Sequence, residues 1–194
     1  MLKARKDTFE GKVCSVSGSG NVAIYTTEKI HQLGGKVVTC SDSNGYIYDE
    51  KGIDLQLLQQ LKEIERRRIK DYIQYRKHAK YVSKGNIWEI PCQVAMPSAT
   101  QNEINGSDAA MLVKNGCIAV GEGANMPTTN EALAYLKEQD VIIVPAKAAN
   151  AGGVAISAVE MTQNAMRQPM SFTAVDNLLK EIMEKIHVES VEAA

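Results

Sequence analysis

The order of apolar and polar positions along the chain predicts short buried strands that alternate with amphipathic helices. Short apolar runs bounded by Gly, Pro or Asn are typical of strands that are buried on both faces of a sheet. On this basis strands are predicted at residues 12–17, 36–40, 93–96, 117–120 and 141–144. Because helical patterns separate them, the chain is expected to adopt an α/β, Rossmann-like doubly wound fold, with a mostly parallel sheet and helices on both faces.

Helical periodicity fills the segments between these strands. Apolar residues recur at spacings near 3.6 from Val22 to Leu33, which predicts a helix between the first two strands. A second helix is expected at residues 107–114, starting on a serine cap, and a third after Thr128, whose spacing to Glu131 is that of a capping box.

Three segments fit this alternation less simply. Residues 54–76 contain two helical stretches interrupted around the sequence ERRR, and residues 77–91 are expected to be irregular. Residues 151–187 are predicted to form two consecutive helices. The second of these carries an apolar stripe that is expected to be uncovered in this chain and therefore to favour association. The stripe consists of Val175, Leu178, Leu179, Ile182, Met183 and Ile186.

Composition and charge narrow the class of protein. The 194 residues are 44% hydrophobic and 23% charged, the profile of a globular chain of one domain. A formal net charge of −1 gives no general attraction to nucleic acid or to an anionic membrane, so neither is an expected partner. Since the start of the chain lacks the apolar core of a secretory signal and no apolar run is long enough to span a membrane, a cytoplasmic location is expected.

The cysteines and histidines indicate neither disulfides nor a metal site. Cys14, Cys40, Cys92 and Cys117 show no C-x-x-C spacing, and all except Cys92 lie in apolar runs predicted as buried strands. All four are therefore expected to be reduced and structural. The histidines lack metal-ligand spacing, so no metal is predicted.

The sequence SGSGNVA holds the main candidate for chemistry. Gly18, Gly20 and Ala23 form a G-x-G-x-x-A variant of the dinucleotide fingerprint, directly after a predicted strand and at the start of a predicted helix. Gly18 would permit a tight turn, Gly20 would let the main chain approach a pyrophosphate, and Ala23 would let helix and strand pack closely. Main-chain N–H groups and the helix dipole would then hold the phosphates. The alternative is a glycine-bearing turn without a ligand.

The residues around Asp42 leave the choice of dinucleotide open. An acid at the end of the second predicted strand normally accepts hydrogen bonds from ribose hydroxyls and favours NAD. Ser41 and Ser43, however, can donate to a 2′-phosphate, and Lys62 and the arginines at 66–68 could fold back toward it. For the basic cluster, the alternative is a solvated helix face.

Six longer motifs resemble those of the hexameric glutamate dehydrogenases. In the order and spacing of that family's nucleotide-binding domain, the chain contains SVSGSGNVA, SDSNGYIYDE, PSATQNE, EGANMPTTNEAL, PAKAANAGGVA and EMTQNA. Within the second motif, the sequence SDS at residues 41–43 is most similar to the corresponding sequence of the NADP-preferring microbial enzymes. The resemblance implies that residues 1–194 form an NAD(P)-binding Rossmann domain, the carboxyl-terminal domain of an enzyme that converts L-glutamate, water and NADP to 2-oxoglutarate, ammonium and NADPH. NAD stays an alternative cofactor.

The resemblance also implies roles for individual residues. They would contact, in chain order, the pyrophosphate, the adenosine end with its 2′-phosphate, the flank of the dinucleotide and the nicotinamide ribose or carboxamide. The implied cofactor-binding residues are Gly18, Ser19, Gly20, Asn21 and Val22, then Asp42, Ser43 and Lys62, then Ala99 and Thr100, and finally Asn125 and Asn150.

Three residues near the end of the chain would meet the glutamate substrate. The resemblance implies that Asn150 bridges cofactor and substrate, and that Val154 and Ser157 contact the glutamate side chain. Simpler alternatives are that Asn125 only forms a turn, that Asn150 only caps a helix, and that Ser157 only bonds its own helix backbone.

The catalytic residues of the complete enzyme are expected outside this sequence. In the family, an amino-terminal substrate domain supplies the catalytic lysine and the general-base aspartate, so no catalytic residue is expected here, and the final carboxyl-terminal helices are also expected to be absent. Hydride transfer needs a closed cleft, and negligible turnover is therefore expected from this polypeptide alone. The complete family enzyme is a homo-hexamer, whereas a monomer or weak dimer is expected of this fragment.

Other functions and some departures from the family pattern stay in view. A free-standing, non-catalytic NAD(P)-binding protein is one alternative, and a methyltransferase is another, since a glycine-rich turn followed by an acid also suits adenosylmethionine. Arg67 and Ala158 each stand where the family usually has glycine, and Pro169 is expected to break the chain between the last two helices.

Overall fold

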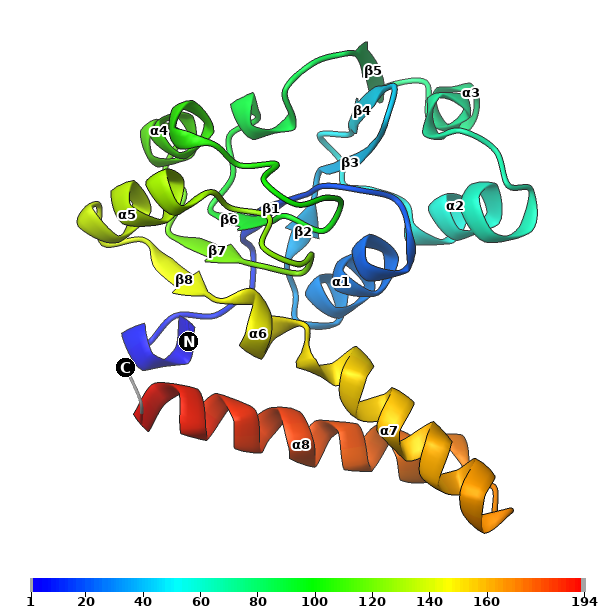
Figure 1. Ribbon diagram of the computed structural model, residues 1–194. Helices are drawn as coiled ribbons and strands as arrows, with labels where there is room; N and C mark the ends of the chain where they lie inside the picture. Colours follow the sequence, from blue (N-terminus) through cyan, green and yellow to red (C-terminus); the bar gives the residue numbers. More distant parts are fainter. Residues whose placement is uncertain (1, 193–194) are drawn as a thin grey trace. The chain divides into compact units, whose positions relative to one another are not determined.

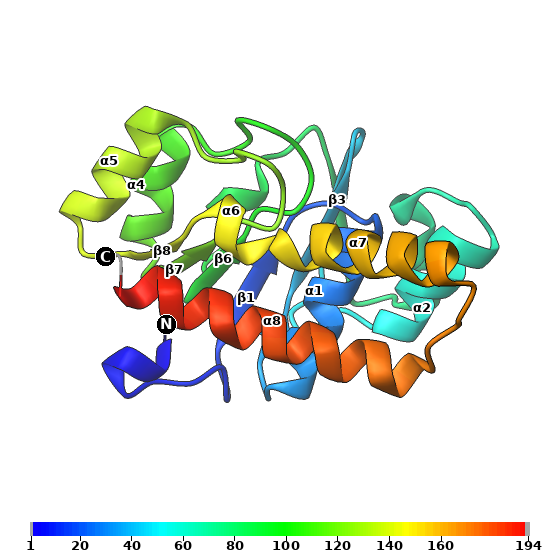
Figure 2. The ribbon, with the colours of Figure 1, turned by 60° about the horizontal axis from the view of Figure 1, so that its bottom comes forward.

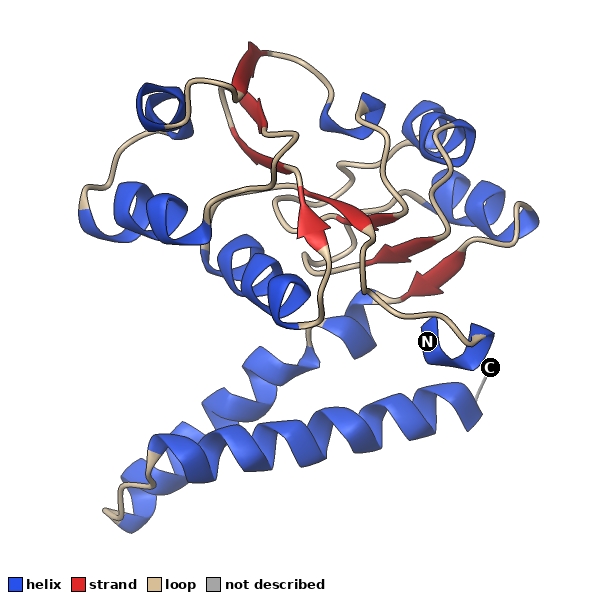
Figure 3. Ribbon diagram, turned by 180° about the vertical axis from the view of Figure 1, so that it is seen from behind, coloured by secondary structure: helices blue, strands red, loops and turns tan. Residues whose placement is uncertain are grey.

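The computed structural model describes residues 2–192, which divide into two compact units. The first unit ends at Val144 and the second begins at Pro145. In the described part of the first unit, five strands form a parallel sheet and three more form a small antiparallel sheet (Figures 1 and 3). The expected α/β fold with a mostly parallel sheet flanked by helices is confirmed.

The elements of the first unit alternate between strand and helix. In chain order they are η1 (Leu2–Arg5), β1 (Val13–Val16), α1 (Asn21–Gln32), β2 (Lys36–Val37), β3 (Thr39–Asp42), β4 (Gly45–Tyr48), α2 (Leu55–Gln59), the π-helical turn η2 (Gln60–Ile64), η3 (Ile69–Asp71), α3 (Tyr72–Tyr75), β5 (Lys80–Ser83), η4 (Ile87–Glu89), β6 (Val94–Met96), α4 (Gly106–Lys114), β7 (Ala119–Gly121), α5 (Asn130–Glu138) and β8 (Ile142–Val144).

The central strands of the parallel sheet are buried on both faces. Its strand order is β2-β1-β6-β7-β8. Val94 on β6 belongs to an apolar cluster with residues of α1 and α2, whereas the next residue, Ala95, belongs to a second cluster with residues of α4 and α5. Because successive side chains on a strand point to opposite faces, this alternation explains why the strands read as continuous apolar runs.

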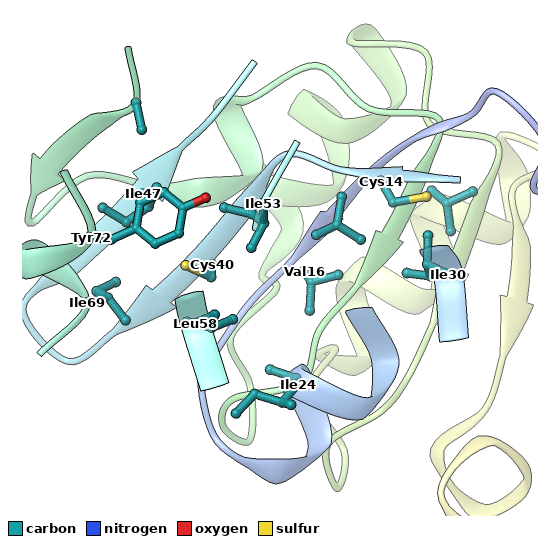
Figure 4. Packing of buried hydrophobic residues seen from close by; sticks show 14 of the residues in the cluster. Cys14, Val16, Ile24, Ile30, Cys40, Ile47, Ile53, Leu58, Ile69 and Tyr72 are labelled. Atoms are coloured by element: carbon teal, nitrogen blue, oxygen red, sulfur yellow. The ribbon is translucent and has the colours of Figure 1, made fainter. Parts of the chain in front are cut away.

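Figure 4 shows the first of these clusters. Ile24 and Ile30 on α1 and Leu58 on α2 lie against Cys14 and Val16 on β1, and all five are at most 2% exposed. The face that α1 buries consists of Ala23, Ile24, Thr27 and Ile30. Val22 and Leu33, the two ends of the predicted apolar pattern, are instead 47% and 46% exposed.

The second sheet corrects two predictions. The strand expected at residues 36–40 is interrupted at Val38, whose carbonyl accepts a hydrogen bond from the Asp49 amide, so that the chain leaves the parallel sheet after β2 and enters the antiparallel sheet as β3. Residues 77–91, expected to be irregular, contain the strand β5 and the helical turn η4. Strand β5 pairs with β4 and completes the antiparallel order β3-β4-β5.

Two helix caps differ from the predicted ones by one or two residues. Asn105, not Ser107, caps α4, and its side chain accepts from the Ser107 and Asp108 amides while Asp108 reaches back to the Asn105 amide. Thr129, not Thr128, caps α5. Thr128 instead forms an isolated parallel bridge with Ile104 and is buried. The capping motif tolerates such shifts because adjacent polar residues compete for the same role.

The segment from α2 to α3 is interrupted where the sequence predicted. Helix α2 continues into η2, and the helical path stops at Glu65 before η3 begins at Ile69. Arg66 adopts a left-handed backbone conformation with φ +52°. Beyond this residue, Arg68 reaches Ser43 and Asp42 at the end of β3, whereas Arg67 contacts Glu65 and Asp71.

The described residues offer no evidence of a disulfide, a metal cluster or a membrane span. All four cysteines are free and buried, as expected, although Cys117 precedes β7 rather than lying in it. Among residues 2–192 no group of three or more metal-ligating side chains was found. None of the helices described is both long and apolar enough to cross a membrane.

The second unit consists of α6 (Ala146–Ala149), α7 (Ala151–Met166) and α8 (Phe172–Glu192). Helices α7 and α8 run side by side, which confirms two consecutive helices (Figure 2). The break between them contains the left-handed Arg167 and Pro169. A side chain at Gly152 of α7 would meet Leu179 at 3.1 Å, so glycine allows the close approach. The apolar stripe of α8 is half-buried along its length, not uncovered as expected.

Candidate functional site

A cavity of about 640 Å³ opens where the first unit's strands β1, β3 and β6 end. Strand β1 leads through α1 to β2 on one side, whereas β6 leads through α4 to β7 on the other side (Figure 1). Such a reversal of connection direction is where open α/β sheets bind ligands, beyond the carboxyl ends of their strands. The cavity is lined by Gly18, Ser19, Gly20, Asn21, Val22, Ser41, Asp42, Ser43, Ser98, Ala99, Thr100 and Glu103.

Gly18 makes the turn out of β1 possible. Its φ is +83°, and its amide donates to Ser41 Oγ at 2.7 Å. A Cβ atom at this position would lie 3.0 Å from the Ser98 carbonyl oxygen, so the turn and the loop after β6 touch through main-chain atoms. Glycine is therefore required here both by backbone conformation and by the close approach of another chain segment.

Gly20 leaves the start of α1 open to the cavity. It is the N-cap residue of a 12-residue helix, and no side chain caps that helix end. A Cβ atom at Gly20 would have no neighbour within 4 Å. The first-turn N–H groups of an α-helix have no intrahelical acceptor, and the helix dipole makes this end positive. No acidic residue lies in the first turn. The geometry thus suits an anion, and phosphate is the anion most often bound in this way.

Asp42 presents a buried oxygen to the same cavity. Its Oδ1 accepts from the Asn44 amide at 2.9 Å, whereas Oδ2 is buried without a hydrogen-bond partner among the described residues. The side chain is only 7% exposed. A buried acceptor without a donor is costly, and a ligand hydroxyl would supply that donor.

Arg68, rather than Lys62, approaches this acid. Arg68 Nη1 donates to Ser43 Oγ at 3.1 Å and lies 3.8 Å from Asp42 Oδ2. Lys62 Nζ instead donates to the Arg67 carbonyl at 3.3 Å, and Lys62 does not line the cavity. The sequence placed all these cations in one basic cluster, but only the chain reversal at Arg66 selects the one that reaches Ser43.

Glu103 holds the loop that forms the opposite wall. Its Oε1 accepts from the Ala99 amide at 3.0 Å and from the Thr100 amide at 3.2 Å. Burial raises the pKa of the Glu103 carboxyl above its ordinary value. The Ser98 amide donates to Ser17 Oγ at 2.8 Å, which ties the loop to the end of β1. Sequence reasoning assigned no role to Ser98 and Glu103, although both lie in the motif PSATQNE.

Asn125 lies beside the cavity but does not line it. It is exposed in the loop that follows β7. The Ala124 amide donates to the Pro97 carbonyl, and the Asn102 amide donates to the Met126 carbonyl, so that the loops after β6 and β7 are joined on both sides of Asn125. This position at the carboxyl edge of the sheet is the one that the sequence suggested.

The predicted substrate residues lie in the second unit. Asn150 occupies the junction of α6 and α7 and makes no side-chain cap of α7, so the capping alternative is not realised. Ser157 Oγ donates to the Gly153 carbonyl at 3.1 Å, the backbone bond expected of a helical serine. Val154 is 74% exposed.

The fold and the cavity define a class of protein: α/β proteins with a doubly wound, mostly parallel sheet and a glycine-rich turn at the carboxyl edge. Comparison with known proteins narrows this class. The family model for Glutamate/Leucine/Phenylalanine/Valine dehydrogenase matches residues 1–194. The chain belongs to this family.

Individual relatives agree with the family model. A glutamate dehydrogenase from Bacteroides thetaiotaomicron is 53% identical over 195 residues, which cover 99% of this chain and 44% of that protein. An NADP-specific glutamate dehydrogenase from Helicobacter pylori is 52% identical over 194 residues, which cover 96% of this chain and 43% of that protein. The crystal structure of Plasmodium falciparum glutamate dehydrogenase matches with a TM-score of 0.92 and 47% identity, covering 96% of this chain and 41% of that one. The chain thus spans less than half the length of these relatives.

Proposed function

We propose that this chain is the nucleotide-binding domain, carboxyl-terminal in the complete protein, of an NADP-dependent glutamate dehydrogenase. One observation carries the proposal: the open, glycine-lined start of α1 faces the same cavity as the buried Oδ2 of Asp42, which accepts no hydrogen bond from the described residues. A dinucleotide joins an anionic diphosphate to a ribose with free hydroxyls, and the cavity offers a matching group for each.

The residues present fit the parts of a dinucleotide. Main-chain amides from Ser19 to Val22 would hold the diphosphate, and Asp42 would accept from the adenosine ribose. The loop that contains Ala99 and Thr100 would lie along the flank of the dinucleotide. Asn125 would contact the nicotinamide end, and Asn150, Val154 and Ser157 would meet cofactor and glutamate in the complete protein.

Arg68 and Ser43 favour the dinucleotide that carries a 2′-phosphate. A guanidinium and a hydroxyl form charge-assisted hydrogen bonds to phosphate. Arg68 Nη1 already lies 3.1 Å from Ser43 Oγ, so both donors stand together beside the acid that would bind the ribose. Asp42 opposes the phosphate by charge repulsion, and we propose that Arg68 offsets this repulsion and makes NADP the preferred cofactor, with NAD as the weaker ligand.

The proposed reaction is the reversible oxidation of L-glutamate with water and NADP to 2-oxoglutarate, ammonium, NADPH and a proton. The bound cofactor supplies the hydride acceptor. This chain would bind and orient it and keep the diphosphate in place, while the catalytic lysine and aspartate would come from the remainder of the protein. We therefore propose negligible turnover by a polypeptide of these 194 residues alone, which would be a monomer or weak dimer.

Calorimetric titration with NADPH, NADH and adenosylmethionine tests the binding proposal. We expect saturable heat with NADPH, weaker binding of NADH and none of adenosylmethionine. Absence of heat at millimolar NADPH would contradict the proposal. Gly20→Val provides a control that is deficient in binding, because it adds a side chain to the cavity at a position where no protein atom lies within 4 Å.

A chimera distinguishes the dehydrogenase from a free-standing dinucleotide-binding protein, the second candidate function. The 194 residues would replace the matching segment of the Helicobacter pylori relative, which is 52% identical to them. Glutamate-dependent reduction of NADP by the chimera, together with none by the chain alone, supports the dehydrogenase. A folded chimera that binds NADPH but does not oxidise glutamate would favour the second candidate.

A further inference from the structure

Arg67 lies in the turn between η2 and η3 and does not line the cavity. Its Nε donates to Asp71 Oδ2 at 2.9 Å, and its Nη1 donates to Glu65 Oε2 at 3.2 Å. The guanidinium therefore joins the first residue of the turn to a residue in η3. We name Glu65, Arg67 and Asp71 the arginine clamp.

Both carboxylates of the arginine clamp are themselves held in place. Gln60 Nε2 donates to Glu65 Oε1 at 2.7 Å, and Gln74 Nε2 donates to Asp71 Oδ1 at 3.1 Å. Each carboxylate thus presents one oxygen to a glutamine and the other to Arg67. Because a guanidinium is a planar fork of donors, it fixes the direction of two acceptors at once.

The main chain of Arg67 is also fixed. Its amide donates to the Leu61 carbonyl at 2.8 Å, and its carbonyl accepts from Lys62 Nζ at 3.3 Å. The next residue but one, Ile69, is fully buried. Arg68 therefore stands between a clamped residue and a buried one, and its side chain leaves the turn toward Ser43 and Asp42.

Arg68 depends on this support because its own contacts are weak. Its side chain is 55% exposed and reaches Asp42 Oδ2 only at 3.8 Å. A long, half-exposed side chain loses much conformational entropy when it is held in one place. A rigid main chain at the base of that side chain reduces the number of positions that the guanidinium can visit.

We propose that Arg67 is a positioning residue that sets the preference for a 2′-phosphorylated dinucleotide by holding the turn from which Arg68 reaches the ribose site. This inference rests on the proposed function and adds a determinant of cofactor selectivity. Arg67 does not touch the dinucleotide and acts only through Arg68.

Arg66 provides a matched control within the same turn. Its side chain is exposed and has no ion pair or hydrogen bond among the contacts of the described residues. Arg66→Ala and Arg67→Ala remove the same charge from adjacent positions, but only Arg67→Ala removes the clamp. Any general electrostatic effect on an anionic ligand is therefore common to both variants.

The test compares the dissociation constants of NADPH and NADH by titration calorimetry. Half-exposed ion pairs contribute modestly, so we expect Arg67→Ala to weaken NADPH binding by about threefold to tenfold. NADH binding should stay within about twofold of the unsubstituted protein, since its ribose carries no phosphate for Arg68 to bind. Arg66→Ala should change neither constant by more than about twofold. Arg67→Lys keeps the positive charge but not the forked guanidinium. Its NADPH dissociation constant should lie between those of the unsubstituted protein and Arg67→Ala.

A double substitution decides whether Arg67 acts through Arg68. In an Arg68→Ala background, Arg67→Ala should cause no further loss of NADPH affinity, because the side chain that it positions is gone. A further, additive loss would overturn the proposal by making Arg67 a direct ligand. Equal weakening of NADPH and NADH, or equal effects of Arg66→Ala and Arg67→Ala on NADPH, would overturn it as well.

Folding controls and the unsubstituted chain separate the possible failures. Far-ultraviolet circular dichroism and thermal melting establish whether Arg67→Ala and Arg67→Met fold. If either does not, the NADPH and NADH dissociation constants of Arg67→Lys are compared with those of the unsubstituted protein instead. Failure of the unsubstituted chain to bind NADPH overturns both the proposed function and this inference. NADPH binding without a selective effect at Arg67 overturns this inference alone.

Discussion

Replacement of Asp49 by asparagine should destabilise the first unit by about 3 kcal/mol. Asp49 follows β4, and its side chain is 0% exposed. One carboxylate oxygen accepts from Tyr72 Oη at 3.1 Å and from Arg76 Nε at 3.2 Å. The other contacts His78 Nε2 at 2.9 Å and accepts from the Lys51 amide at 3.0 Å. The carboxylate thus connects β4 with α3 and with the residues that lead into β5.

The magnitude follows from what asparagine leaves behind. Its amide keeps one oxygen but turns an NH₂ group toward side chains that are themselves donors. Breaking a buried ion pair by removing one partner costs about 3–5 kcal/mol. The lower end applies because the Arg76 side chain is 28% exposed and recovers part of its hydration. A domain of this size loses about 2–4 °C of melting temperature per kcal/mol, which predicts a fall of about 6–12 °C.

Urea unfolding followed by Trp88 fluorescence measures this loss, since Trp88 is buried in the folded first unit. The matched control is Asp140→Asn, which breaks an ion pair with Arg5 in which the Asp140 side chain is 87% exposed. Exposed pairs contribute about 0–1 kcal/mol, so this control should hardly shift the midpoint. If Asp49→Asn unfolds at the same urea concentration as Asp140→Asn, the reasoning from burial is refuted.

Three further predictions concern the cavity and the core. Gly18→Ala should lower the free energy of unfolding by at least about 1–2 kcal/mol, because φ is +83° and the new methyl group meets the Ser98 carbonyl oxygen at 3.0 Å. Gly20→Ala, whose methyl group has no neighbour within 4 Å, should lower NADPH affinity but reduce the melting temperature less than Gly18→Ala does. The opposite ranking in thermal melts would count against the geometry. Burial raises the pKa of Glu103, so the stability linked to its protonation is present below the ordinary glutamate pKa and is lost as pH rises through the higher folded value. In urea titrations the free energy of unfolding of Glu103→Gln, relative to the unsubstituted chain, should therefore increase from about pH 4 to pH 7, and a pH-independent difference would contradict the shift. Leu58→Ala removes a fully buried side chain and should destabilise by about 2–5 kcal/mol, and an unchanged melting temperature would show that Leu58 is not in the core.

The alternation of strands and helices, and with it the fold class, was readable from the sequence. A strand in a parallel sheet is buried on both faces, so β6 and β7 appear as short apolar runs, as residues 93–96 and 117–120 predicted. The interruption between η2 and η3 was also readable around ERRR. These features depend on the residues of one short segment, and their signals are therefore local.

The sequence was less informative where two local solutions compete. Either Ser107 or Asn105 can cap α4, and either Thr128 or Thr129 can cap α5, and the choice depends on which residue is free to turn outward. Thr128 does not cap α5, because it forms the parallel bridge with Ile104. Strand β5 escaped prediction because two of its residues are exposed and two are only half-buried, and because its partner, β4, lies far away in the chain.

The cavity shows the same division between local and distant determinants. The glycines of the turn after β1 and the acid at the end of β3 were identified from the sequence, because glycine spacing and strand ends are properties of one segment. Glu103 and the selection of Arg68 over Lys62 required the tertiary structure. The physical reason is that each depends on where distant segments meet: Glu103 on the ends of β1 and β6, and Arg68 on a left-handed reversal that turns a helix-like basic segment back toward β3.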